Sequence, residues 1–205
     1  MTASESAAPP LDPEDRARAN LYGVIGRLYY APPDPNLLAE ISGSEESGQA
    51  EEGGGLVAAW RGVREASRSA FPAVLRQEYD TLFVGVGRAQ VTPYLSGYAE
   101  PASPDRYLVR LRGQLGRWGL GRREGVFEVE DHISGICDVM RLLVEGAHSL
   151  ERQRLFFNEF VYPGVLPFCV ALQNSPTASY YKQVAALTCS YFEIEKSAFE
   201  MADSE

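Results

Sequence analysis

Helical periodicity interrupted by proline is the feature of this sequence that most constrains its fold. Four segments begin with a break followed at once by proline, at Asp12-Pro13, Phe71-Pro72, Ser103-Pro104 and Ser175-Pro176. Proline is tolerated in the first turn of a helix, because the backbone N–H that it lacks would have no helical partner there. Apolar residues follow each break at helical spacing. The four breaks therefore predict four helix starts.

The apolar positions between the breaks predict a fold built of helices alone. In the first segment the apolar stripe consists of Leu21, Val24, Ile25, Leu28 and Tyr29. Similar stripes recur along the chain, with a further break predicted at Pro163-Gly164, and only residues 91–98 resemble extended structure. We therefore predict an all-α, single-domain bundle of roughly eight to ten helices.

Two stretches fall outside this pattern. Residues 1–12 are mostly small and polar, which predicts a frayed N-terminus. Residues 42–55, SGSEESGQAEEGGG, are rich in glycine and glutamate and lack an apolar anchor, which predicts a mobile loop. The residues before this loop are too few for an independent core, so residues 13–200 are expected to form one domain.

The charge of the chain limits its partners. The net charge is −9, from 19 basic and 28 acidic side chains, so nucleic acid is a poor partner and a basic one is favoured. The charge is also uneven. Residues 100–123 hold six arginines and two acidic residues, whereas residues 124–138 hold five acidic residues and no basic one.

Several features favour a cytoplasmic location. Cys137, Cys169 and Cys189 lie in apolar helical settings and form no CxxC pair, so buried free thiols in a reducing compartment are expected. The N-terminus lacks the basic and apolar regions of a secretory signal. No run of 18 apolar residues occurs, so no membrane span is expected.

The acidic run that leads into residues 133–147 is the strongest candidate for chemistry. It consists of Glu124, Glu128, Glu130 and Asp131, followed by His132. Three interpretations stay open: capping of the following helix, a charged recognition site, and acid–base catalysis. Asp131 and His132 are adjacent and would diverge by about 100° on a helix, so they do not form a natural dyad. The chain has two histidines and no phosphate-binding or HExxH motif, so no metal or cofactor is expected.

A second candidate is the stretch Glu78 to Tyr98, EYDTLFVGVGRAQVTPYLSGY. It begins as an amphipathic helix, stops at Gly85 and Gly87, and continues as a long apolar loop with two tyrosines. Loops of this length in a compact domain are usually functional or disordered, and this composition argues against disorder. The loop either lines a binding site or covers the core.

These two stretches resemble the motifs of the TorD/DmsD/NarJ family of maturation chaperones for molybdoenzymes. The first, Tyr79-x-x-Leu82-Phe83-x-Gly85 followed by Pro93-Tyr94-x-Ser96-x-Tyr98, is similar to the family's YxxLFxG…PYxSxY. The second, Glu130-Asp131-His132-Ile133, is similar to the family's E-P-x-D-H-[IL] segment. Val129 stands where proline is common, and Phe160 and Gly164 stand where related chains often have histidine and tryptophan. The resemblance spans about residues 15–195.

The resemblance implies an all-helical cytoplasmic chaperone domain that is not an enzyme and carries no cofactor. Its partner would be the apo form of a molybdoenzyme catalytic subunit, the twin-arginine leader peptide of that subunit, or both, held back from export until the cofactor is inserted. A homodimer is compatible with the sequence. The implied client-binding residues are Tyr79, Leu82, Phe83, Gly85, Pro93, Tyr94, Ser96, Tyr98, Glu128, Glu130, Asp131 and His132.

Within that set, the roles follow from the chemistry of the leader. The carboxylates of Glu128, Glu130 and Asp131 would pair with its arginines. Its apolar region would lie on Leu82, Phe83, Tyr94 and Tyr98. The residues Tyr79, Leu82 and Phe83 fit a core position equally well, and His132 either tunes binding or is a structural histidine.

Two alternatives remain from the sequence. One is a small helical hydrolase that uses Asp131 and His132 with a metal, against which the shortage of histidines argues. The other is a scaffold that binds a folded subunit and ignores its leader. The sequence does not name the client.

Overall fold

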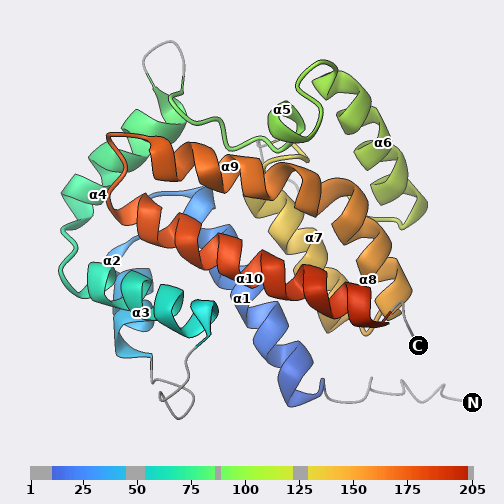
Figure 1. Ribbon diagram of the computed structural model, residues 1–205, viewed down its shortest axis with the longest axis horizontal. Helices are drawn as coiled ribbons and strands as arrows, with labels where there is room; N and C mark the ends of the chain where they lie inside the picture. Colours follow the sequence, from blue (N-terminus) through green and yellow to red (C-terminus); the bar gives the residue numbers. More distant parts are fainter. Residues whose placement is uncertain (1–10, 45–53, 86–88, 122–128, 203–205) are drawn as a thin grey trace, which may run out of the picture.

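The computed structural model describes residues 11–44, 54–85, 89–121 and 129–202, and within these ranges every regular element is helical (Figure 1). In these described ranges, ten α-helical and two π-helical segments join into nine continuous helices. The predicted all-α bundle is confirmed. The segments are α1 (Pro13–Tyr30), α2 (Pro35–Gly43), α3 (Gly55–Arg68), α4 (Pro72–Tyr79), η1 (Asp80–Val84), α5 (Ser96–Ala99), α6 (Pro104–Arg117), α7 (Ile133–Glu145), α8 (Leu150–Phe156), η2 (Phe157–Val161), α9 (Tyr162–Asn174) and α10 (Tyr180–Ala202).

The last helix organises the bundle. α10 packs against α9 and α3, while α1 and α7 pack together behind it (Figure 1). Glycine permits the close approach of α1 to α7, because a Cβ at Gly26 would lie 3.3 Å from the Cβ of Cys137. The short helix α5 packs against α9 and α6. It carries Ser96 and Tyr98 of the first sequence motif, whereas Tyr79, Leu82 and Phe83 of that motif lie on α4 and η1.

Three of the four predicted helix starts are confirmed, with proline in the first turn of α1, α4 and α6. At α1, the Asp12 carboxylate accepts a 2.8 Å hydrogen bond from the N–H of Asp15, as expected of an N-cap. α2 starts in the same way at Pro35, capped by Asp34. It ends at Gly43 and α3 begins at Gly55; most of the predicted 42–55 loop, and residues 1–10, lie outside the described residues.

The fourth predicted start, at Ser175-Pro176, is wrong. α10 begins at Tyr180 and its N-terminus is capped by Glu78, at the end of α4. The carboxylate of Glu78 accepts hydrogen bonds from the N–H groups of Ser179 (2.8 Å), Tyr180 (3.2 Å) and Tyr181 (2.9 Å). A negative charge at this position satisfies N–H groups that have no helical partner. A residue about a hundred positions away in the sequence therefore decides where the helix begins.

The break predicted at Pro163-Gly164 is also wrong, because α8, η2 and α9 form one continuous helix. The π-turn of η2 inserts one residue into the helix, and the N–H of Tyr162 bonds to the carbonyl of Phe157. Pro163 follows at once, so its missing N–H falls in the first turn after the π-turn. The helix thus passes through a proline that ordinarily ends one.

This continuous helix, Leu150–Asn174, is long and apolar enough to cross a membrane by length and composition, and its most apolar 18-residue window has a mean hydropathy of 1.5. Half of its most apolar window is buried inside the protein. Phe156, Phe157, Phe160 and Phe168 of this helix are all buried in the core. Packing within the bundle accounts for its apolar composition.

The three cysteines are unpaired, as predicted; Cys137 and Cys169 are also buried as expected, whereas Cys189 is only partly buried. Burial raises the pKa of the Cys137 thiol well above its ordinary value, and it also raises the pKa of Cys169. These thiols therefore stay protonated and act as small apolar groups in the core.

Candidate functional site

The fold brings the two sequence motifs together. Residues 93–95 run antiparallel to residues 131–133, with one isolated β-bridge between Tyr94 and His132. The N–H of Leu95 donates to the carbonyl of Asp131 and the N–H of Ile133 donates to the carbonyl of Pro93, both at 2.9 Å. Residues 93–95 and the turn before α7 are therefore joined in one segment.

Asp131 lies inside this segment with 1% of its surface exposed. One carboxylate oxygen, Oδ2, accepts a 3.3 Å hydrogen bond from the N–H of Ser96, the first residue of α5. The other, Oδ1, is buried and has no hydrogen-bond partner among the described residues. The capping interpretation of Asp131 thus applies, but to α5 rather than to the helix that follows it in sequence.

The cap of α7 is His132 instead. Its Nδ1 accepts a 3.2 Å hydrogen bond from the N–H of Ser134 and lies 2.6 Å from the Ser134 hydroxyl. The ring is buried and lies edge-on to Tyr94, with centroids 5.4 Å apart. His132 is held as a structural histidine.

These contacts bear on the catalytic alternative. The Asp131 carboxylate faces α5 and the His132 ring faces the first turn of α7, so the two side chains do not form an acid–base pair. Within the described ranges, no group of three histidine, cysteine, aspartate or glutamate side chains is placed to hold a metal.

Three of the predicted contact residues belong to the core. Leu82, Phe83 and Tyr79 are at most 8% exposed, and Phe83 packs edge-on against Tyr181 at 4.9 Å. The Tyr79 hydroxyl donates to the carbonyls of Tyr29 and Tyr30, which fixes the end of α1. Tyr79 therefore anchors α4 to α1 in this structure.

The helix that carries these residues ends as the sequence predicts. Gly85 has a φ of 65°, and its N–H bonds to the carbonyl of Asp80 at 2.7 Å. This left-handed conformation suits glycine. Gly87 lies outside the described residues.

The two loop tyrosines, Tyr94 and Tyr98, are half-buried. The Tyr98 hydroxyl donates a 3.0 Å hydrogen bond to the carbonyl of Thr92, and its ring lies 5.7 Å from that of Phe168. Burial raises the pKa of Tyr98 to about 12, so its hydroxyl stays protonated near neutral pH. Tyr94 has a similar exposure, whereas Pro93 and Ser96 are buried.

Glu130 is the acidic side chain of the motif that solvent reaches. Its side chain is 15% exposed and forms an ion pair with Arg112 of α6, at 3.0 Å. The sequence indicated a basic block in residues 100–123 but did not show that one of its arginines faces Glu130. Glu128 lies outside the described residues.

The position of the segment depends on a glycine of α9. A Cβ at Gly164 would lie 2.8 Å from the carbonyl oxygen of Leu95 and 2.9 Å from its Cβ. Since Leu95 is also bonded to Asp131, any side chain at Gly164 would push on both motifs. This contact gives a physical reason for the glycine in this chain.

Replacing Gly164 with alanine is expected to destabilise the protein by about 1–3 kcal/mol, the usual cost of overpacking a buried site. Urea unfolding measures the change. Gly113→Ala in α6 is the matched control, because a Cβ there meets nothing within 4 Å. Alanine should be neutral at Gly113 or stabilise it by up to about 1 kcal/mol. Equal effects at the two sites would show that α5 moves aside freely.

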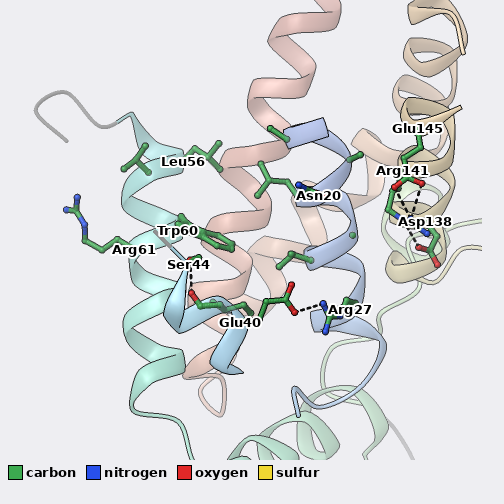
Figure 2. Close-up of a pocket in the computed structure, with 17 residues that line it drawn as sticks. Asn20, Arg27, Glu40, Ser44, Leu56, Trp60, Arg61, Asp138, Arg141 and Glu145 are labelled. Carbon is green, nitrogen blue, oxygen red and sulfur yellow. Dashed lines mark hydrogen bonds and ion pairs between the residues drawn. The ribbon is translucent and has the colours of Figure 1, made fainter. Parts of the chain in front are cut away.

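A separate pocket of about 750 Å³ lies between α1, α2, α3 and α7 (Figure 2). Leu21, Val24, Leu56 and Trp60 line it, so it forms where the predicted apolar stripes of α1 and α3 are only partly covered. Its charged rim is internally paired: Arg27 bonds Glu40 at 2.8 Å. Arg141 lies between Asp138 and Glu145 on α7. None of the site residues predicted from the sequence lines this pocket.

The fold is all-helical, and it pairs the two sequence motifs in one segment. Residues 49–169, more than half of the chain, match the family described as "Nitrate reductase delta subunit". The chain belongs to this family of redox enzyme maturation proteins, which confirms its resemblance to the TorD/DmsD/NarJ chaperones.

A solved structure has the same fold. The "Putative Redox Enzyme Maturation Protein From Archaeoglobus Fulgidus" is 18% identical, with a TM-score of 0.50. The similarity covers 93% of this chain and 98% of that chain. No curated protein matches the sequence.

Proposed function

We propose that this protein is a cytoplasmic chaperone that binds the apo catalytic subunit of a molybdoenzyme, through its twin-arginine leader peptide, the subunit itself, or both. It supports cofactor insertion and assembly before export and performs no catalysis. Family membership supports this role. The observation that carries the proposal is the antiparallel pairing of the two motifs, which joins the tyrosine loop to the segment with Glu130.

In this proposal the motif residues divide into two groups. Glu130 attracts an arginine of the leader, as Glu128 does in the adjoining segment, and the half-buried Tyr94 and Tyr98 contact its apolar residues. The buried members position them, namely Tyr79, Leu82, Phe83, Pro93, Ser96, Asp131 and His132, and the half-buried Gly85 ends the helix that carries the first three. Carboxylates beside an aromatic surface suit a peptide that is basic at one end and apolar at the other.

The first test is a pull-down of the tagged protein from its native cytoplasm, with mass spectrometry of the captured proteins. The expected result is a molybdoenzyme subunit, captured more weakly when its leader is deleted. Undiminished capture without the leader would indicate a scaffold for the subunit alone. The proposal would be contradicted if no such subunit were captured from cells that make these enzymes.

A contact residue and a positioning residue should respond differently to substitution. Glu130→Gln is expected to weaken binding of a fluorescent twin-arginine peptide about 5- to 10-fold, since one charge-assisted contact is lost, without changing the melting temperature. Asp131→Asn is expected to lower stability by about 1 kcal/mol, because the charge at the start of α5 is lost, and to weaken binding as the loop loosens.

Glu65→Gln is the control for a change in net charge, because Glu65 is an exposed residue of α3. It should leave both the affinity and the melting temperature unchanged. If Asp131→Asn weakened binding with no loss of stability, Asp131 would be a direct contact. If Glu130→Gln left the affinity unchanged, the leader would bind elsewhere.

A further inference from the structure

The ion pair between Arg112 and Glu130 has an unusual consequence for a site that is proposed to bind arginine. Arg112 projects from α6, and both its Nε and its Nη2 lie 3.0 Å from the same oxygen of Glu130, Oε2. The side chain of Arg112 is 51% exposed, whereas that of Glu130 is 15% exposed. The free protein therefore already holds a guanidinium on the carboxylate.

We infer that Arg112 is an intramolecular competitor for the client's arginine at Glu130, so that the site is self-occupied until a client displaces it. This inference rests on the proposed function. The two guanidinium groups are chemically identical and cannot both take the same position on Oε2. A client guanidinium that takes the Oε2 position binds only the fraction of molecules in which Arg112 has moved away, so its apparent affinity is reduced by that fraction.

The geometry favours a contact that opens readily. Strong arginine–carboxylate pairs use two parallel hydrogen bonds to two oxygens, whereas Arg112 places both nitrogens on one oxygen. Half of the Arg112 side chain is in solvent, and exposed pairs of this kind are weak and easily screened. Arg112 thus keeps Glu130 neutralised in the free protein without closing the site to a better-placed guanidinium.

The test is Arg112→Gln, with binding of three fluorescent peptides that share one apolar segment and begin with paired arginines, lysines or glutamines. Removing the competitor should tighten the arginine and lysine peptides by the same factor, about two- to five-fold, the range that an exposed ion pair allows. The glutamine peptide makes no use of Glu130, so its affinity should not change.

Two variants exclude simpler explanations. Arg106→Gln removes the same charge from an exposed position on α6, away from Glu130, and should tighten the cationic peptides less than Arg112→Gln does. The double variant Arg112→Gln with Glu130→Gln should bind no tighter than Glu130→Gln alone. Melting temperatures check that each variant is folded.

The outcomes separate the inference from the function on which it rests. If Arg112→Gln binds the arginine peptide no tighter than the unmodified protein, or no tighter than Arg106→Gln does, Arg112 is not a competitor. If neither the unmodified protein nor Arg112→Gln binds any of the three peptides, the proposed leader-binding function fails instead.

Discussion

Replacing Glu195 with alanine is expected to lower the free energy of unfolding by about 3–5 kcal/mol, the cost of removing one partner from a buried ion pair. Glu195 lies on α10 with 3% of its surface exposed. Its two carboxylate oxygens accept hydrogen bonds from Nε and Nη2 of Arg18 on α1, at 2.8 and 2.9 Å. The Tyr22 hydroxyl donates a third bond, at 2.8 Å.

The electrostatics of Arg18 explain the size of this effect. Burial acts to lower the pKa of Arg18, but the hydrogen bonds and charge of Glu195, together with Asp15, outweigh it and raise the pKa above its ordinary value. Without Glu195, the guanidinium would be left largely desolvated beside Gln153, whose side-chain oxygen accepts a hydrogen bond from it. Asp15, on α1 itself, would still pair with Arg18, but the contact between α1 and α10 would lose the carboxylate that compensates the charge there.

Urea unfolding of Glu195→Ala measures this loss. Glu200→Ala is the matched control, because Glu200 lies on the same helix, 64% exposed, and pairs with Lys196 one turn earlier. Its effect should stay within about 0.5 kcal/mol. A loss below about 1 kcal/mol at Glu195 would mean that water reaches Arg18 and replaces the carboxylate.

A steep loss of stability above about pH 10 is the second large effect that we expect. Burial is the main cause that raises the pKa of four core tyrosines well above the ordinary value: Tyr22, Tyr29, Tyr181 and Tyr191. In the unfolded chain these hydroxyls ionise near pH 10. Above that pH the folded protein binds more protons than the unfolded chain, so stability falls as pH rises.

The sign and size of this change in stability with pH follow from proton linkage. The stabilisation is fully present below about pH 10 and is lost as the pH rises towards the folded-state pKa values, by about 1.4 kcal/mol per pH unit for each tyrosine. Urea unfolding between about pH 8 and pH 11 measures the slope. Tyr181→Phe should make it shallower by one tyrosine's share, whereas Tyr30→Phe should not, because Tyr30 is 51% exposed. A flat profile would mean that the core tyrosines ionise without unfolding.

Much of the fold was predictable because the signals that encode it are local. An N-cap and the proline after it act within one turn, so Asp12-Pro13 and Phe71-Pro72 marked helix starts correctly. The helix stop at Gly85 was also predictable, since only the backbone at that residue decides it. The motif residues that point to the family are likewise read from order and spacing alone.

The errors have one physical origin, which is partners distant in the sequence. The start of α10 depends on Glu78, and the helix continues past Pro163 because the core holds a π-turn before it. At the site, Asp131 caps α5 across the antiparallel pairing, and Arg112 forms an ion pair with Glu130. No pattern within a few residues of these positions contains that information.

The sequence by itself therefore determined the all-α class, most helix ends and the identity of the two motifs, because propensity, periodicity and capping depend on neighbours within about four residues. Only the tertiary structure decided which motif side chains are buried supports, such as Asp131 and His132, and which reach solvent, such as Glu130. Burial and charge pairing depend on which elements pack together, and packing joins residues that the sequence keeps far apart.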